Sequence, residues 1–222
     1  MDIAVFIVLI LITLGSYIRI RIIYNKYKKM DIKKLMSGFE VSRTIIDSYD
    51  MNNIYITESR QNIFSYYDSN RKVIRLVKEV FNDTSIASCA ISATIASYSI
   101  LDKKNDKLYN IRKMVTPFLK VLLYTGYLII AFGLLFGHIG TIQIGTFLEY
   151  AVLLFHLFTF KIEIYAKQLA KKELTKQSIV NKKELIQIEE VLNANTLICF
   201  ASIVFPIAEL IKKVIEYGAS SK

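Results

Sequence analysis

Long apolar runs alternate with basic and polar stretches along this chain of 222 residues. A membrane-spanning helix needs about 20 predominantly apolar residues. Four runs reach or approach that length: 3–18 with its extension to 23, 118–139, 145–162 and 194–211. In the first run, Arg19 and Arg21 must extend their charged ends toward the lipid headgroups. The pattern therefore predicts a mainly α-helical integral membrane bundle with about four transmembrane helices.

These runs divide the chain into predicted segments, and Pro117 is expected at the start of the second span. The segments are a first transmembrane helix (1–23), a cytoplasmic segment (24–117), a transmembrane helical hairpin (118–162), a basic cytoplasmic helical segment (163–193), and a fourth transmembrane helix with its tail (194–222).

Positive charges follow the first run and separate the third run from the fourth, whereas the loop 137–145 between the second and third runs carries no charge. Lysine and arginine concentrate on the cytoplasmic side of membrane spans. The N-terminus is therefore predicted outside a prokaryotic cytoplasmic membrane, with 24–117 and 163–193 inside. Only the pair Lys212 and Lys213, after the fourth run, opposes this orientation.

The net charge of +10 accompanies a mean hydropathy of +0.37 and an apolar content of 53%. Soluble domains average about 45–50% apolar residues, so the spans account for the excess. The basic residues are mixed with acidic ones, and no nucleic-acid-binding motif is present. Anionic lipid, and not nucleic acid, is therefore the expected partner of this charge.

The cytoplasmic segment between the first two runs predicts local structure of a different kind. Ser37 and Glu40 have the spacing of a capping box and begin a helix to about Ser48. Two β-prone runs, 54–57 and 73–77, are expected to form a short hairpin, separated by a polar stretch that ends in the turn-forming residues 67–70. The Ser- and Thr-rich stretch 84–101 predicts either a buried helix capped by Asp83 or Thr84, or a short helix inserted in the membrane surface.

Four short motifs resemble those of the YugP-type family of membrane-embedded neutral zinc metallopeptidases. They occur in the family's order among the predicted spans: SGFEVSR at 37–43 (S-G-x-E-V-A-R), YDSNRKVIRL at 67–76 (Y-D-P-x-x-K-x-x-R-L), FKIEIYA at 160–166 (L-P-V-E-F-x-A) and VLNANTL at 191–197 (V-L-N-A-A-x-L). The resemblance covers nearly the whole chain. It implies a small cytoplasmic α+β layer, like that of gluzincin-type peptidases, beside the membrane helices.

The resemblance also implies a zinc site whose chemical groups are missing here. In H-E-x-x-H peptidases two histidines on one helix face bind zinc, the glutamate between them polarises the bound water, and a later glutamate is the third ligand. Alignment with the family places Thr94 and Tyr98 at the histidines, Ile95 at the catalytic glutamate and Glu163 at the third ligand. No His, Asp or Glu occurs in 84–101, and Tyr66 replaces a further family histidine. The vestigial site is thus predicted to hold no catalytic residue and no metal.

Glu149, His156 and Glu163 are spaced seven residues apart on the third span, so they share one helix face. Ionisable groups within a span usually face the bundle interior. The stripe therefore indicates either a histidine satisfied by a neighbouring polar group, or a polar face that contacts a partner helix or relays protons. Cys89 and Cys199 are isolated in apolar stretches and are expected to be free buried thiols.

These observations favour a degenerate homologue of a peptidase over an enzyme. The expected function is that of a pseudopeptidase which binds a protein partner or a membrane-protein segment without cutting it. Two alternatives stay open: a membrane zinc metallopeptidase with unconventional ligands, which alone would need zinc as a cofactor, and a structural scaffold for an active paralogue. Partners expected from the sequence are the lipid bilayer and a membrane protein or paralogue, without nucleic acid.

Overall fold

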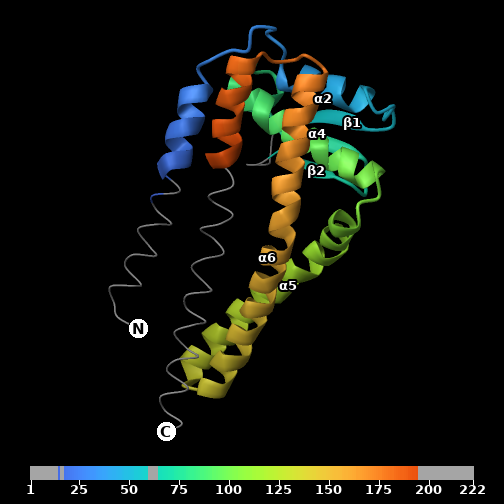
Figure 1. Ribbon diagram of the computed structural model, residues 1–222. Helices are drawn as coiled ribbons and strands as arrows, with labels where there is room; N and C mark the ends of the chain where they lie inside the picture. The colour runs from blue at the N-terminus through green and yellow to red at the C-terminus, as the bar shows by residue number, and fades with distance from the viewer. Residues whose placement is uncertain (1–14, 16–17, 60–64, 195–222) are drawn as a thin grey trace. The chain divides into compact units, whose positions relative to one another are not determined.

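The computed structural model describes residues 15, 18–59 and 65–194. Two of the predicted spans, 3–18 and 194–211, lie almost entirely outside these residues. The described chain is mainly helical and contains one small sheet (Figure 1). Its named elements are α2 (Gly38–Asp47), β1 (Tyr55–Ser59), β2 (Tyr66–Asp68), β3 (Val73–Val77), α3 (Lys78–Phe81), α4 (Ile86–Lys103), α5 (Lys107–Phe136) and α6 (Ile139–Lys176). Residues 18–27 and 182–194 are also helical.

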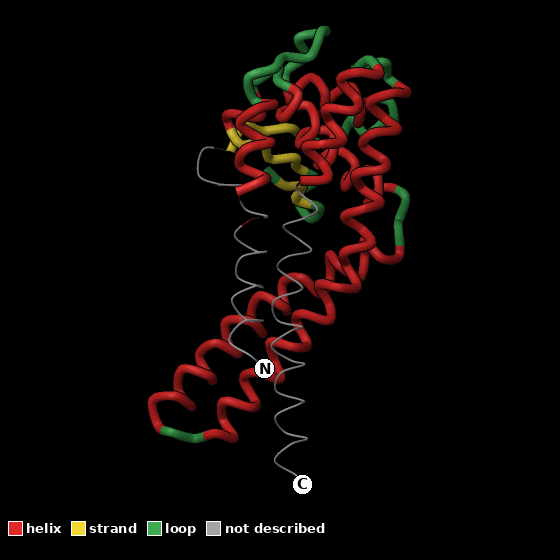
Figure 2. Tube along the Cα trace, turned by 60° about the vertical axis from the view of Figure 1, so that its left-hand side comes forward, coloured by secondary structure: helices red, strands yellow, loops and turns green. Residues whose placement is uncertain are grey.

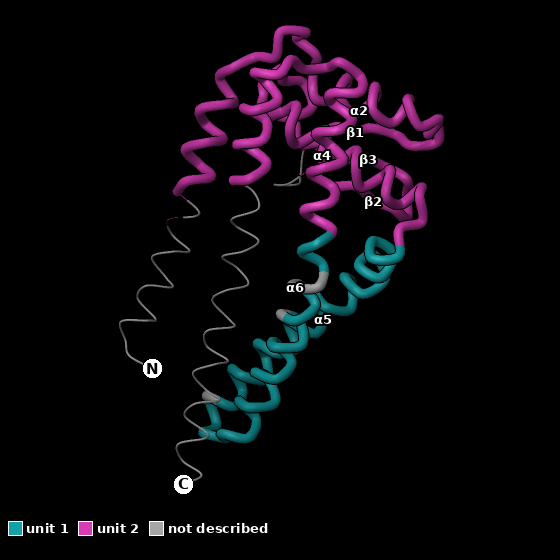
Figure 3. The backbone as a smooth tube through the Cα atoms, in the orientation of Figure 1, with its two compact units in different colours: residues 1–14, 107–161, 199–222 teal, residues 15–106, 162–198 magenta. Residues whose placement is uncertain are grey.

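The chain forms two compact units (Figure 3). The described part of the first unit is 107–161, which comprises α5 and the first part of α6. The second unit contains 15–106 and 162–198, and therefore the sheet, α2, α3, α4 and the rest of α6. Helix α6 continues without a break past 162, where the sequence predicted that the third span ends.

In the first unit, α5 and α6 form a hairpin around the turn at Gly137, whose φ is +68°. Glycines let the two helices approach closely. A Cβ atom on Gly145 would lie 2.6 Å from Ile130 Cγ1 and 2.8 Å from the Gly126 carbonyl oxygen. Small residues at helix contacts are typical of membrane helices, where close packing drives association.

Apolar side chains cover the outside of this hairpin; Phe118, Leu128, Leu135 and Phe147 are each at least 71% exposed. One helical stretch among the described residues, 107–133, has the length and mean hydropathy (1.7) that a membrane span requires. It begins earlier than predicted, because Pro117 lies inside α5 and not at its start. The described residues thus contain one candidate span, and the predicted total of four is not established.

In the second unit, α4 is the central helix, and 14 of its 18 residues are buried. Four of its hydroxyl groups donate to carbonyls of the same helix, as shown by Ser92 Oγ donating to the Ser88 carbonyl (2.6 Å) and Ser97 Oγ to the Ala93 carbonyl (2.9 Å). Such back-bonding allows a helix rich in serine to be buried. The predicted buried helix is therefore confirmed.

The helix cap differs from the prediction. Ser85 is the N-cap residue of α4, and its side chain accepts a hydrogen bond from the Ser88 backbone N–H. Asp83 instead supports this cap, since its carboxylate accepts hydrogen bonds from the Ser85 and Ser88 hydroxyls at 2.6 and 2.9 Å. At α2, the capping box between Ser37 and Glu40 is present as predicted.

The three strands form a mixed sheet in the order β1-β3-β2, visible side by side in Figure 2. The predicted hairpin between 54–57 and 73–77 is wrong, because β1 and β3 pair in parallel. The strand antiparallel to β3 is β2, which lies where the sequence indicated a turn. The turn lies two residues later than predicted, at 69–72: Lys72 adopts a φ of +54°, and Asp68 Oδ1 accepts a hydrogen bond from the Arg71 N–H. This tight turn places β2 on one edge of β3 and leaves the other edge to β1.

Candidate functional site

Helices α4 and α6 bring together two of the residues that the sequence assigned to the vestigial zinc site. Tyr98 projects from α4, and its hydroxyl donates a hydrogen bond to Glu163 Oε2 on α6. The two residues are 65 positions apart in the chain and belong to the same compact unit. The residue aligned with the second histidine is therefore bonded directly to the residue aligned with the third zinc ligand.

Thr94 and Ile95 lie one turn earlier on α4 and are 7% and 8% exposed. The Thr94 hydroxyl donates to the Ala90 carbonyl at 2.8 Å, so its hydrogen is used within its own helix. Ile95 carries no titratable group that could act as a general base. This turn of α4 is thus filled by a back-bonded hydroxyl and a hydrocarbon side chain.

The side chains present do not fit a catalytic zinc ion. Such an ion takes three protein ligands from His, Cys, Asp or Glu. In this cluster Glu163 is the only residue of these types, and among the described residues no group of three of them is close enough to hold a metal. The remaining oxygens are neutral hydroxyls of a threonine and a tyrosine. No reaction step can therefore be assigned to a metal at this position.

The predicted polar stripe is divided between the two units. Glu149 lies in the first unit, where its side chain packs beside Gly126 of α5; a Cβ atom on that glycine would be 3.4 Å from Glu149 Cγ. Glu163 lies in the second unit and is bonded to Tyr98. His156 is a helical residue of α6, but its side chain is outside the described set. The role of the stripe stays a prediction.

Cys89 is a free thiol on α4 with an exposed fraction of 1%. Burial raises its thiol pKa, with a smaller contribution from the charge of Glu184. Because the thiolate is the nucleophilic form, Cys89 is not poised for catalysis. The prediction of a free buried thiol is confirmed for Cys89, while Cys199 lies outside the described residues.

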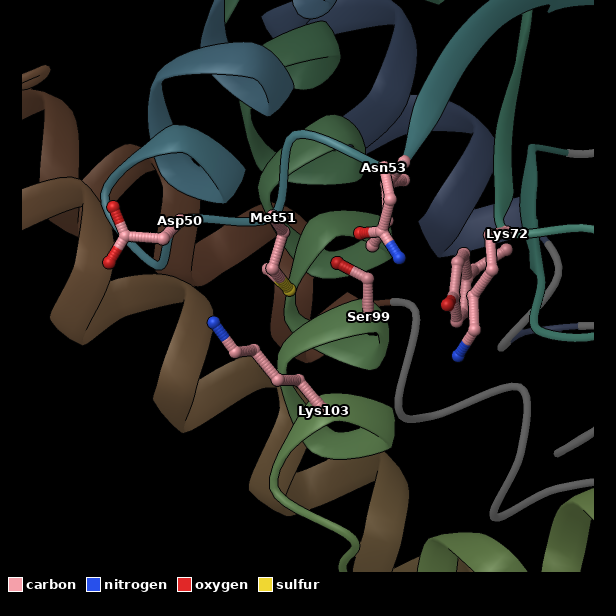
Figure 4. Close-up of a pocket in the computed structure, with 8 residues that line it drawn as sticks. Asp50, Met51, Asn53, Lys72, Ser99 and Lys103 are labelled. Atoms are coloured by element: carbon pink, nitrogen blue, oxygen red, sulfur yellow. The ribbon is translucent and has the colours of Figure 1, made fainter.

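A pocket on another side of α4 was not predicted from the sequence. This pocket has a volume of about 330 Å³ and lies among the loop after α2, the turn before β3 and the end of α4 (Figure 4). Its polar side chains include Asp50, Lys72 and Lys103. They come from three separate segments, and of the three only Lys72 belongs to a motif, so the folded chain is needed to reveal them together.

Comparison with known proteins agrees with the resemblance seen in the motifs. The family model described as "Putative neutral zinc metallopeptidase" matches residues 2–217. A relative from Bacillus subtilis (strain 168), named "Putative membrane protease YugP", is 23% identical over 194 residues, which cover 87% of this chain and 86% of the relative. No solved structure matches the chain significantly. Because the family model spans nearly the entire sequence, this protein belongs to the neutral zinc metallopeptidase family.

Proposed function

We propose that this protein is a pseudopeptidase of the membrane, which binds a protein partner or a membrane-protein segment without cleaving it. The observation that carries this proposal is the hydrogen bond from Tyr98 to Glu163. In an active relative of the H-E-x-x-H type, the metal would connect the catalytic helix to the later glutamate. Here a phenol makes that connection, so the helix pair is held together while the hydrolytic groups are absent.

Membrane placement supports the same function. The α5–α6 hairpin exposes large apolar side chains, and 107–133 has the composition of a span. The relative in Bacillus subtilis is named a membrane protease. We infer that the second unit lies on the cytoplasmic face of a prokaryotic membrane with the N-terminus outside, since this unit contains most of the basic residues.

Metal analysis of the purified full-length protein tests the loss of the zinc site. After dialysis, we expect less than about 0.1 zinc per chain in the natural protein, because one carboxylate does not hold catalytic zinc. The triple variant Thr94→His, Ile95→Glu, Tyr98→His restores the motif opposite Glu163 and is the matched positive control. Stoichiometric zinc in the natural protein that disappears in Glu163→Ala would instead establish a peptidase with unconventional ligands.

Partner binding is tested with a photo-crosslinking amino acid placed at Tyr66 in the intact membrane, on the exposed side of β2. Crosslinks to an uncut membrane protein support the pseudopeptidase. Crosslinks only to a relative that carries the H-E-x-x-H motif support the scaffold function. Adducts that contain cleaved fragments contradict both.

A further inference from the structure

The pocket beside the end of α4 is built separately from the vestigial zinc site. Ser99 lines it, whereas Tyr98 does not. Consecutive helix positions point about 100° apart, which follows from 3.6 residues per turn. Tyr98 is bonded to α6, and Ser99 contributes to the pocket wall together with Lys103, one turn further along the same helix. The pocket lies entirely within the second unit.

Its inner wall is buried and uncharged. Met51 and Ile54 are 2% and 3% exposed and supply the apolar part. Ser99 is fully buried, and its hydroxyl donates to the Ala96 carbonyl at 2.6 Å, so its oxygen remains able to accept a hydrogen bond. Ligand pockets typically combine such an apolar wall with a few fixed polar groups, in volumes of about 300–1,000 Å³.

Two opposite charges line this pocket without pairing. Asp50 lies just after α2 with a φ of +51°, held there by its own N–H bonded to the Asp47 carbonyl. The Lys103 ammonium group donates to the Tyr49 carbonyl. Within the described part of the chain, neither Asp50 nor Lys103 forms an ion pair. A carboxylate and an ammonium group thus line the same cavity, and each is positioned by a backbone hydrogen bond and not by the other.

A second cation is fixed at the other end. Lys72 Nζ lies 2.5 Å from Asp102 Oδ2, and the Tyr67 hydroxyl donates to the same oxygen at 2.9 Å. Burial opposes the charged form of Asp102, but these bonds outweigh burial and lower its pKa. Lys72 is thus held in place with further N–H donors to offer. Figure 4 shows Lys72 and Asn53 at one end of the pocket and Asp50 at the other, with Met51 and Ser99 between them.

We propose that this pocket binds a small zwitterion carrying an ammonium and a carboxylate group, that is, a free amino acid or a short peptide. Asp50 would bind the ammonium group, and Lys103 the carboxylate, because the charge of Lys72 is already balanced by Asp102. The Ser99 oxygen lies between the two ends of the pocket, where an amide of the ligand would lie.

Other ligand classes fit the charges less well. An apolar ligand would remove water from Asp50 and Lys103 without replacing it, which is costly for charged groups. A polyanion such as a phosphate ester would meet Asp50, while the charge of Lys72 is already balanced by Asp102. Only a ligand with both signs of charge satisfies both Asp50 and Lys103.

Calorimetric titration of the full chain in detergent tests this inference. The probes are alanyl-leucine, its N-acetyl form without the ammonium group, its C-terminal amide without the carboxylate, and free leucine. We expect saturable binding of alanyl-leucine or leucine below about 10 mM, and at least about tenfold weaker binding of the two blocked peptides. The tighter of the two unblocked probes distinguishes a peptide site from an amino-acid site.

Three variants locate the binding. Asp50→Asn removes the charge but keeps a side chain that tolerates positive φ, and it should weaken binding about tenfold or more. Lys103→Gln should do the same. Lys104→Gln is the matched control, because this neighbouring exposed lysine does not line the pocket. Equal melting temperatures show that the variants are folded. Absence of saturable binding, equal affinity for blocked peptides, or an unchanged affinity in folded Asp50→Asn would overturn the proposal.

Discussion

Tyr98 stands where the family alignment places a metal-binding histidine on α4, and it makes a different interaction. A histidine there would bind metal through a ring nitrogen, whereas the Tyr98 hydroxyl donates to the Glu163 carboxylate. Hydrogen bonds to charged groups contribute about 1.5–3 kcal/mol to stability. Tyr98 is only partly buried, so the value for this pair should lie near the lower end.

We therefore predict that Tyr98→Phe and Glu163→Gln each lower the melting temperature in detergent, with a loss of about 1–2 kcal/mol. The double variant should lose less than the sum of the single losses, because both remove the same bond. Tyr55→Phe, at a tyrosine with 68% exposure, is the control and should leave stability unchanged. Unchanged melting temperatures, or strictly additive losses, would show that the pair does not stabilise the contact of α4 with α6.

The positions in this site could be predicted from the sequence, but the bond between them could not. Alignment of 84–101 with the family's helix chose Thr94, Ile95 and Tyr98, and the motif at 160–166 chose Glu163. A hydroxyl and a carboxylate that lie 65 residues apart leave no periodicity or spacing that indicates contact. The same is true of Asp50 and Lys103, whose approach to one pocket depends on how α2 and α4 end.

At the scale of elements, the S-G-x-E motif shows why glycine is needed beside a capping box. A Cβ atom on Gly38 would lie 2.1 Å from the Val80 carbonyl oxygen. The Gly38 N–H also donates to the Asp83 carbonyl at 3.2 Å, which fixes the start of α2 against the segment before α4. To make room for a Cβ atom, the Val80 carbonyl or the start of α2 would have to move, and either movement would disturb this packing.

Gly38→Ala should therefore destabilise the protein by about 3 kcal/mol, the upper part of the range for overpacking a fixed site. Gly140→Ala is the matched control, because nothing lies within 4 Å of a Cβ atom there and alanine is the better helix former. It should be neutral or slightly stabilising. Melting temperatures of both variants in the same detergent check the prediction. Similar values for the two variants would mean that α2 can shift away from Val80 at little cost.

Sequence patterns predicted the positions of helices and strands better than they predicted which strands pair. The helix after Ser37, the buried helix within 84–101 and the strand at 73–77 are all present. The error was in the partner of that strand, since parallel and antiparallel arrangements of short β-prone runs have the same alternation. The turn at Lys72, whose positive φ is unusual for a lysine, pairs β3 with β2 and leaves the other edge of β3 to β1.

At the scale of the whole molecule, composition already indicated the separation of apolar spans from basic segments. The described structure places apolar side chains on the outside of the α5–α6 hairpin, and buried serines and small residues in α4. The side of the membrane that each segment occupies follows only from the distribution of charge. Hydropathy and helix length do not determine this orientation, so it needs a direct test.

Cysteine labelling in intact cells provides that test. In a background with Cys89→Ala and Cys199→Ala, Gly140→Cys should react with a membrane-impermeant maleimide, because the uncharged loop 137–145 is predicted outside. Lys182→Cys is exposed within the basic segment and should react only after the membrane is permeabilised. Both residues are exposed in the structure, so a difference in labelling reports the membrane and not burial. Labelling of both sites from outside, or of Lys182→Cys alone, would reject the proposed orientation and place the pocket with Asp50 and Lys103 on the outer face.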